Sequence, residues 1–325
     1  MADVMPSAFE HGGPDALGAA EHDFSTNANA LGPCPQVQAA VQRADACRYP
    51  DPAYGALRER LADLHGVQPT RIHVAASGSE FIMRMTAAVR RLGGQGVHAP
   101  RPGYGDYARA AAAFGMASAP AREAHLVWHG DPASPTGQSS APPQLAPRAA
   151  GVVDMAYAPL RLEGTTAKVE GYWQLWTPNK ALGLTGVRAA YAVAPATADE
   201  SLAQALDALM PSWPIGSHGV AMLQGWAEPH AQQWVRDCLP VLREWKLRQL
   251  LLCESLGWTC LPGNASFFCA QPRANDLSAL LSHLRAAHGI KLRDATSLGL
   301  PGHVRLNVLP PVSQDALHQA LVHWR

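Results

Sequence analysis

Short apolar runs alternate with helix-like stretches between about residues 50 and 210, and this alternation restricts the fold more than any other sequence feature. After IHVAA (72–76), a helical stretch runs from Phe81 to Leu92, and turns or helix-like segments separate most later apolar runs. This order is typical of an α/β domain with a mostly parallel sheet. The further strand candidates are GVHAP (96–100), HLVWHG (125–130), GVVDM (151–155), YWQLWT (172–177) and AAYAVA (189–194).

The pattern changes after residue 210. Residues 216–256 are long and helical, with a break allowed at Pro240. Strand candidates and helices then follow in separate groups, which is typical of a smaller α+β domain. They are WTCLP (258–262), SFFCAQ, a helix around 276–288, IKLRD (290–294), HVRLNVL (303–309) and a final helix from Ser313.

The length of 325 residues suits two unequal domains. Residues 1–34 look irregular and indicate an ordered arm, and residues 35–65 hold two helical stretches separated by a turn at Tyr49–Pro52. We therefore expect three parts. These are an N-terminal arm and first helix in residues 1–47 that belong to the small domain, a large domain in 48–215, and a connecting helix and small C-terminal domain in 216–325.

Composition argues against several functional classes. The 26 basic and 26 acidic side chains balance, so no charged surface is expected for nucleic acid or for an anionic membrane. Apolar stretches such as 186–197 are too short to span a bilayer, and MADVMPSAFEHGG does not resemble a secretory signal. Six cysteines without a CxxC pair indicate reduced thiols, and 14 histidines show no HExxH or tight cluster. We expect a cytoplasmic protein without a metal site.

The stretch from Thr177 to Arg188 is the most informative one for chemistry. Lys180 follows a strand end and precedes a glycine-rich turn, although a lysine near glycines is more often simply solvated. Asp154 ends a buried apolar run, where a carboxylate is costly unless it is paired. It can be a cap or turn residue, or the partner of a protonated ring nitrogen.

Two turns upstream fit the same kind of site. Ser77–Glu80 lies between a strand and a helix, where free N–H groups and the helix dipole attract anions, although an ordinary serine N-cap explains it equally well. Tyr104 can stack on a flat ring, although its motif also fits a plain turn before a helix. Each of these signals is weak alone.

Together the motifs resemble the class I/II aminotransferase family, the pyridoxal 5′-phosphate (PLP) enzymes of fold type I. The resembling branch is the one shared by histidinol-phosphate aminotransferase and the threonine-phosphate decarboxylase of cobalamin synthesis. The resemblance covers nearly the whole chain and implies an α/β fold with a mostly parallel central sheet flanked by helices, a smaller α+β domain and PLP as cofactor. The motifs are HGG (11–13), DFSTNANALGP (23–33), RYPDP (48–52), SGSE (77–80), RPGYGDY (101–107), DPASPTG (131–137), VVDMAY (152–157), TPNKALGLTGVR (177–188) and LRDATSLGLPGHVRLNV (292–308).

The resemblance implies roles for residues at matching positions. Lys180 matches the lysine that forms the Schiff base with the cofactor and moves the proton at the substrate α-carbon. Asp154 matches the partner of the pyridinium, and Tyr157 matches the tyrosine that hydrogen-bonds the phenolic oxygen of the cofactor. The other implied cofactor contacts are Tyr104 on the ring, Gly78, Ser79, Thr177 and Arg188 around the phosphate, and Ser134.

The same resemblance implies a substrate side. Arg305 matches the arginine that clamps a substrate carboxylate, and Arg293 matches a position that contacts a substrate phosphate. Asn27 lies in a segment that closes over the site, and His11 opens an HGG element similar to that of the decarboxylase. Tyr49 matches a tyrosine that reaches the phosphate in the neighbouring subunit, which implies a homodimer with shared active sites around a small-molecule substrate.

The chain departs from the family pattern in the middle. Ser134 stands where an asparagine usually bonds the phenolic oxygen, so either water bridges the gap or Tyr157 acts alone. Asn179 stands where serine is common. Residues 138–153 leave room for little more than a strand, so we expect that one helix on the sheet face is lost.

Three functions stay open. We favour transamination of the histidinol-phosphate aminotransferase type, because most members of this superfamily transaminate. Threonine-phosphate decarboxylation is the alternative, and the HGG element supports it. A PLP-binding paralogue without turnover is a remote third, suggested by Ser134 and the short middle segment. The choice between the first two depends on the groups that hold the substrate carboxylate and phosphate.

Overall fold

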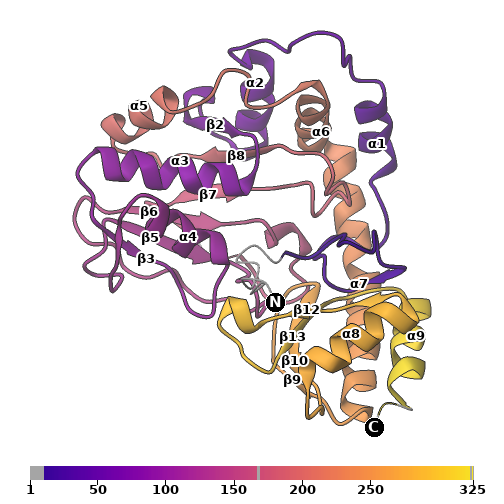
Figure 1. The fold of residues 1–325 in the computed structure, drawn as a ribbon. Coiled ribbons are helices and arrows are strands. Elements are labelled where there is room, and N and C mark those ends of the chain that lie inside the picture. Colours follow the sequence, from indigo (N-terminus) through magenta and orange to yellow (C-terminus); the bar gives the residue numbers. More distant parts are fainter. Residues whose placement is uncertain (1–10, 167–168, 323, 325) are drawn as a thin grey trace.

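The large part of the protein is a seven-stranded sheet, seen here in a computed structural model that describes residues 11–166, 169–322 and 324. Within these residues the strand order is β2-β8-β7-β6-β5-β3-β4 (Figure 1). Only β8 runs against its neighbours β2 and β7, so the predicted mostly parallel sheet is confirmed. The strands are β2 (Ile72–Ala75), β3 (Gly96–His98), β4 (Ala117–Ser118), β5 (Leu126–Gly130), β6 (Ala150–Asp154), β7 (Trp173–Trp176) and β8 (Ala190–Val193).

Successive residues of the central strands face opposite sides of this sheet, as strand geometry requires. Leu126 and Trp128 of β5 and Val152 of β6 belong to the core cluster that α3, α4 and α5 complete on one face. On the other face, α2 and α6 pack over the β2 and β8 side. The helices named are α2 (Gly55–His65), α3 (Gly78–Arg91), α4 (Gly105–Ala113), α5 (Glu200–Ala208) and α6 (Ser217–Ala227).

The face of β5 and β6 opposite α3 is covered without a helix. Residues 138–149 contain three prolines, which exclude a regular helix, and they run without helix or strand from the loop after β5 to β6. Tyr172 packs with Val127 and Val153 there, and its hydroxyl donates to the carbonyl oxygen of Pro143. The expected loss of one helix is therefore confirmed, and an irregular proline-rich cover takes its place.

The smaller part carries a four-stranded antiparallel sheet in the order β12-β13-β10-β9 (Figure 1). The N-terminal arm joins this part, because β1 (His22–Asp23) pairs in parallel with β11 (Ile290–Lys291). Residues 1–10, and with them most of the segment tested for a secretory signal, lie outside the described residues. The remaining elements here are β9 (Thr259–Cys260), β10 (Phe267–Gln271), β12 (Arg293–Asp294), β13 (Val304–Asn307), α8 (Leu277–His288) and α9 (Pro311–Val322).

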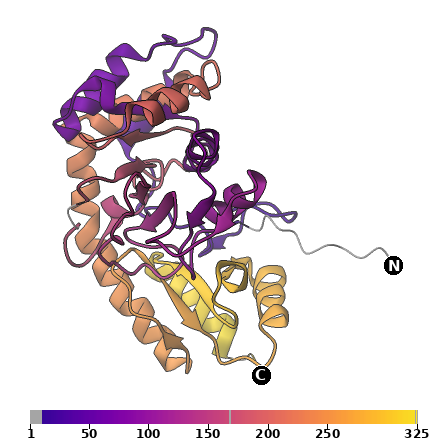
Figure 2. The ribbon, with the colours of Figure 1, turned by 90° about the vertical axis from the view of Figure 1, so that its left-hand side faces the viewer.

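The long helix α7 (Pro229–Ser255) runs from beside the large sheet to beside the small one (Figures 1 and 2). The helical run breaks at Glu228, and no break occurs at Pro240, where one was allowed. Glu228 is extended because it precedes Pro229, and a proline disfavours helical backbone in the residue before it. Pro240 is instead accommodated inside α7.

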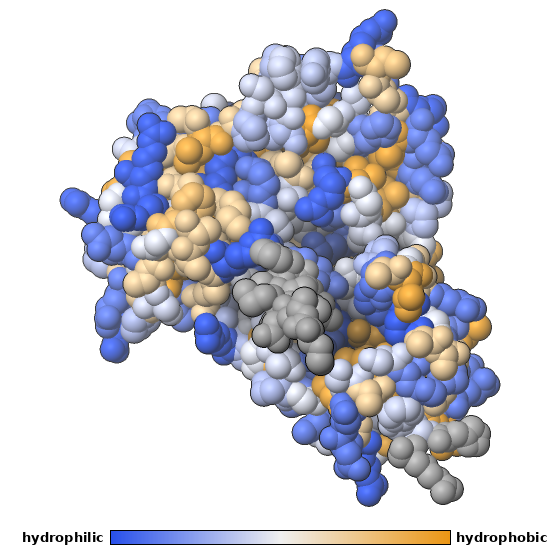
Figure 3. Space-filling view, viewed as in Figure 1, coloured by the Kyte–Doolittle hydropathy of each residue, from blue (hydrophilic) through white to orange (hydrophobic). Residues whose placement is uncertain are grey.

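Three short 3-10 turns and one more helix complete the described fold. They are α1 (Pro35–Gln42), η1 (Pro69–Arg71), η2 (Ala158–Leu160) and η3 (Thr296–Leu298). None of the helices in the described ranges is both long and apolar enough to cross a membrane. The surface is hollowed where the two parts of the molecule meet (Figure 3).

Candidate active site

A pocket lies at one edge of the large sheet, lined by loops that follow its strands. The carboxyl ends of the parallel strands meet at this edge, and the antiparallel β8 begins there, so residues far apart in sequence converge. Among the described side chains, no group of three or more His, Cys, Asp or Glu residues could hold a metal ion. The predicted site residues in the lining are Gly78, Ser79, Tyr104, Ser134, Asp154, Tyr157, Thr177, Lys180 and Arg188.

The start of α3 forms one end of the pocket. Ser77 is the N-cap, and its Oγ accepts a hydrogen bond from the backbone N–H of Glu80 at 3.1 Å. Gly78 approaches Thr177 so closely that a Cβ would lie 2.9 Å from its Cγ2. The first turn of the helix and the guanidinium of Arg188 line the same pocket, so this end suits a phosphate. Ser77 is thus an ordinary N-cap, and the helix start that it caps also suits an anion.

Asp154 ends β6 at the floor of the pocket. Its Oδ1 accepts the N–H of Ala156 at 2.9 Å, and its Oδ2 accepts the hydroxyl of Tyr107 at 2.8 Å. Burial raises the pKa of Asp154, while the Lys180 ammonium and these two hydrogen bonds lower it. The carboxylate is therefore paired and oriented, which suits the partner of a cationic ring.

Lys180 sits in the loop after β7, held at both its backbone and its side chain. The Nζ atom donates to Thr177 Oγ1 at 3.1 Å and lies 5.5 Å from the ring centre of Tyr157. The carbonyl oxygen of Lys180 accepts the N–H of Asn29 at 2.9 Å. The arm is thereby attached directly to the loop that carries the lysine.

Tyr104 stands at the start of α4 with its ring in the pocket lining. Its hydroxyl donates to Asp106 Oδ2 at 2.8 Å and lies 3.2 Å from Ser79 Oγ. Burial raises the pKa of Tyr104, so the phenol stays neutral. The ring of His11 lies 6.4 Å from that of Tyr104, so the start of the described arm reaches this side of the pocket.

Arg305 and Arg293 are paired across β13 and β12 and are both buried. Arg305 Nη1 donates to Ser134 Oγ at 3.3 Å, and its Nη2 donates to the carbonyl oxygen of Ser25 at 2.8 Å. Arg293 donates to the carbonyl oxygen of Asp294 at 2.7 Å and to Ser297 Oγ at 2.8 Å. Arg305 forms no ion pair with a carboxylate in the described part of the chain, and its Nε has no partner there.

Two predicted site residues, Asn27 and Tyr49, do not line the pocket. Asn27 is buried in the arm, yet neither atom of its amide has a hydrogen-bond partner in the described structure. Tyr49 is 78% exposed, lies outside the pocket lining and stacks on Trp213 with ring centres 4.4 Å apart. The fold thus brings all the predicted cofactor residues except Tyr49 together within one chain.

Sequence reasoning missed Tyr107, whose hydroxyl holds Asp154 and whose ring stacks on Trp128 at 5.0 Å. The RPGYGDY motif (101–107) contains both tyrosines, but the resemblance implies a role only for Tyr104. The spacing of three residues at a helix start could have identified it, because it puts both side chains on one face.

The buried ion pair between Arg161 and Asp131 was also missed, with Nη2 and Oδ2 2.8 Å apart. Arg161 follows the turn that carries Tyr157, and Asp131 begins the loop that carries Ser134. The pair therefore links two loops of the site. No local sequence pattern predicts it, because the two residues are 30 positions apart.

Comparison with known proteins agrees with this geometry. The profile of the family described as "Aminotransferase class I and II" matches residues 21–323. A histidinol-phosphate aminotransferase of Symbiobacterium thermophilum is 29% identical, and the alignment covers 92% of this chain and 90% of that protein.

Solved structures show the same fold. Histidinol-phosphate aminotransferase from Sinorhizobium meliloti, in complex with pyridoxal-5′-phosphate, has a TM-score of 0.79 at 21% identity, covering 99% of this chain and 97% of that one. L-threonine-O-3-phosphate decarboxylase from Porphyromonas gingivalis has a TM-score of 0.76 at 19% identity, covering 92% and 98%. At such identities the likeness establishes the fold alone.

Proposed function

Because this chain belongs to the class I and II aminotransferases and is an enzyme with PLP as its cofactor, we propose that it transfers the amino group of a small phosphorylated amino compound. The substrate thus belongs to the class that histidinol phosphate represents. Buried Arg305, with no described carboxylate beside it, carries this proposal.

The residues of the pocket fit PLP. The first turn of α3 and Arg188 would hold its phosphate, and Asp154, already oriented by Tyr107, would stabilise a positive ring nitrogen. Lys180 would hold the cofactor covalently. Bound PLP withdraws electrons from the α-carbon of the substrate. The Lys180 amine, 3.1 Å from Thr177 Oγ1, moves the proton at that carbon.

The substrate side is positively charged. Burying a guanidinium without a counter-ion costs desolvation free energy, and an anionic ligand group beside Arg305 would offset it. Ser134 joins the two sides, because it lines the pocket and accepts a hydrogen bond from Arg305. The carboxylate of the 2-oxo acid acceptor would bind Arg305, and the phosphate of the amino donor would lie near Arg293 with its amine toward Lys180. Asn27, whose buried amide has no described partner, would add a contact from the arm.

Decarboxylation of threonine phosphate is the second candidate. The arm brings His11 to within 6.4 Å of the Tyr104 ring, so the HGG element that resembles the decarboxylase does lie beside the pocket. The reaction follows from which bond of the α-carbon the protein aligns with the cofactor, and Arg305 sets that alignment. A place in cobalamin biosynthesis would follow only from this second candidate.

A homodimer with shared sites is part of the proposal. Tyr49 is exposed, stacks on Trp213 and does not line the pocket of its own chain. Such a position fits a side chain that contacts the active site of a second subunit. Mixed dimers of Tyr49→Phe and Lys180→Ala chains should recover one working site. No recovery would argue against sharing.

We also propose a cytoplasmic location. All six cysteines are free thiols, and four of them are buried. Reduced thiols are the rule in the cytoplasm.

A substrate panel tests the proposed reaction. Holoenzyme is incubated with L-histidinol phosphate and a set of 2-oxo acids, and separately with L-threonine O-3-phosphate, while oxo-product and CO2 are measured independently. We expect oxo-product that depends on the acceptor, and loss of turnover when the phosphate is removed from the substrate. CO2 release without an acceptor would establish the second candidate instead, and equal turnover of dephosphorylated compounds would refute a phosphorylated substrate.

A further inference from the structure

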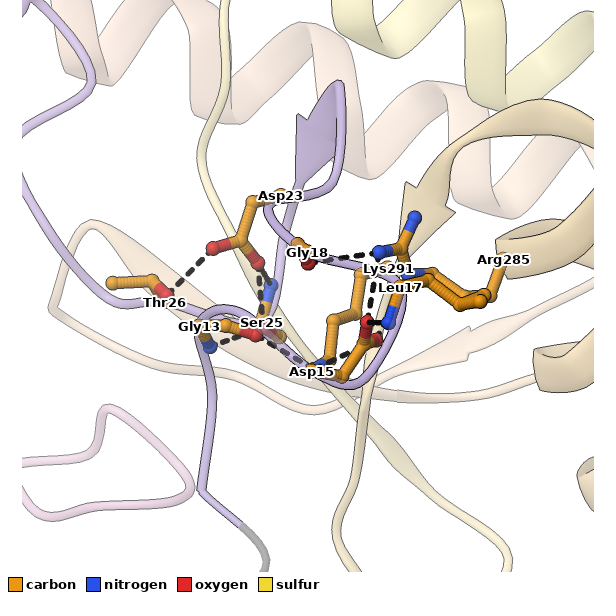
Figure 4. A network of polar contacts seen from close by, with 9 residues as sticks. All are labelled: Gly13, Asp15, Leu17, Gly18, Asp23, Ser25, Thr26, Arg285 and Lys291. Atoms are coloured by element: carbon orange, nitrogen blue, oxygen red, sulfur yellow. Dashed lines mark hydrogen bonds and ion pairs between the residues drawn. The ribbon is translucent and has the colours of Figure 1, made fainter.

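The described arm begins with a turn that Asp15 organises. The N–H of Gly18 donates to the carbonyl oxygen of Asp15 at 2.9 Å, and the N–H of Leu17 donates to Asp15 Oδ1 at 2.9 Å. Figure 4 shows this turn beside Arg285 and Lys291, which belong to α8 and β11 of the smaller part. The turn therefore lies against the domain that carries Arg305.

Asp15 is held by two cations at once. Arg285 donates from Nε to Oδ2 and from Nη2 to Oδ1, both at 2.8 Å, and Lys291 Nζ lies 3.1 Å from Oδ2. Arg285 Nη2 also donates to the carbonyl oxygen of Gly18 at 2.9 Å. These hydrogen bonds, Arg285 first, hold the pKa of Asp15 far below its usual value. A forked arginine pair within a charge network is the kind of surface ion pair that does stabilise a structure.

The contacts continue from this cluster toward the pocket. Lys291 Nζ donates to the carbonyl oxygen of Gly13 at 2.6 Å, and the N–H of Gly13 donates to Ser25 Oγ at 2.9 Å. Gly12 packs so tightly on Ser25 that a Cβ would lie 2.1 Å from its carbonyl oxygen. Ser25 is also fixed by Asp23, which accepts its N–H at 2.9 Å and its hydroxyl at 2.5 Å (Figure 4).

The last contact reaches the substrate side. The Ser25 carbonyl oxygen accepts Arg305 Nη2 at 2.8 Å, which is shorter than the 3.3 Å bond from Nη1 to Ser134 Oγ. The guanidinium of Arg305 is thus oriented chiefly by a backbone atom of the arm. An unbroken series of ion pairs and hydrogen bonds joins Asp15 to Arg305, through residues from both ends of the chain.

We propose that Asp15 is a positioning residue: paired with Arg285 and Lys291, it holds residues 12–18 against Ser25 and so fixes the carbonyl oxygen that orients Arg305. Asp15 touches neither substrate nor cofactor. Its effect on turnover rests on the proposed role of Arg305 as the carboxylate clamp. The effect should be confined to compounds that bear a carboxylate, because the proposed cofactor residues line the pocket and take no part in the series of contacts that reaches Arg305.

Asp15→Asn tests the proposal, because asparagine keeps the size of the side chain and removes its charge. Asp315→Asn is the matched control, since Asp315 also pairs with an arginine, Arg248, on the smaller part but lies outside the series of contacts. For the 2-oxo acid acceptor, which bears a carboxylate, we expect KM to rise about tenfold in Asp15→Asn with kcat within about twofold, the size typical of mutations along a coupled network. L-histidinol phosphate lacks a carboxylate, so its KM should stay unchanged.

A second measurement does not depend on turnover. Hydrogen exchange of peptides covering residues 12–18 and 24–27 should accelerate in Asp15→Asn holoenzyme and remain as in wild type in Asp315→Asn. Lys291→Met should act in the same direction, which provides a second variant if Asp15→Asn does not fold. Unchanged exchange at 24–27 would overturn the proposal, because Ser25 would then be fixed without Asp15.

Arg305→Lys separates this proposal from the proposed function. If Arg305→Lys raises KM for the carboxylated compound and Asp15→Asn does not, the positioning role is refuted and the clamp stands. If Arg305→Lys has no effect on either compound, the clamp itself is refuted, and the exchange of residues 24–27 alone decides whether Asp15 positions Ser25. Accelerated exchange in the variant would then support the structural half of the proposal.

Discussion

The two sides of the proposed site are built differently: the cofactor wall lines the pocket, and the substrate wall is the group around Arg305, which meets the pocket at Ser134. The cofactor wall consists of residues within a few positions of strand ends in one sheet, such as Asp154 on β6 and Lys180 after β7. The substrate wall is assembled from separate pieces, since Arg305 on β13 is oriented by Ser25, 280 residues away in the chain. A wall of strand ends is fixed once the sheet forms, whereas the assembled wall can shift with the arm. We therefore expect changes in the first wall to lower kcat and changes in the second to raise KM.

The largest effect should come from Lys180→Ala, which removes the amine that we propose moves the proton. We expect kcat to fall by about 10⁴-fold, the upper range for loss of a general acid–base group. The measurement is single-turnover kinetics, with PLP content checked by absorbance. Borohydride treatment of wild-type holoenzyme should leave the cofactor attached at Lys180. A label on Lys246 or Lys291 in the mapped peptides would contradict the assignment.

Asp154→Asn should have the next largest effect within the same wall. An amide cannot balance a positive ring, so kcat should fall by about 10²–10³-fold, typical for loss of one electrostatic stabiliser. KM and PLP retention should change little, because the phosphate end is untouched. Steady-state kinetics with Asp315→Asn as control checks this. A raised KM with unchanged kcat would contradict the expectation that changes in the cofactor wall act on kcat.

Tyr107→Phe should act through Asp154 with a smaller effect. The Tyr107 hydrogen bond lowers the pKa of Asp154, so its loss raises that pKa, and the carboxylate becomes ionised only at higher pH. The acidic limb of the kcat profile should therefore move to higher pH, with about a tenfold loss on that limb, as expected for one hydrogen bond to a charged group. Tyr172→Phe, which alters a tyrosine hydrogen bond outside the pocket, is the control. An unshifted limb would make Tyr107 a packing residue only.

Asn27→Ala should give the smallest change, and it probes the substrate wall. The buried amide has no described partner, so its removal leaves no group newly unpaired, and unfolding free energy should fall by less than about 1 kcal/mol. KM for the phosphorylated substrate should nevertheless rise about fivefold, the loss of one net hydrogen bond. Chemical denaturation and steady-state kinetics together check this. A large stability loss with unchanged KM would assign Asn27 to the fold.

The difference between the walls also explains what could be predicted from sequence. Asp154 and Lys180 could be located because a strand end is a local pattern, and parallel strands deliver their ends to one edge. The contact of Tyr107 with Asp154 could not, because it depends on how α4 packs on the sheet. The pair of Arg161 with Asp131 likewise joins two loops whose approach follows from the whole fold. The break at Glu228 is a local feature, since Pro229 follows it, whereas the sequence pattern alone allows a break at Pro240 as well.

The packing of the arm bears on how its HGG element is used to compare relatives. Gly12 has no room for a Cβ against Ser25, and Gly13 has a φ of 103°, which L side chains rarely adopt. Both glycines are thus required by the shape of the arm, whichever reaction the enzyme performs. Two of the three letters therefore carry no information about chemistry. In any classification of such chains by motif, His11 is the one position of the three that can discriminate between activities.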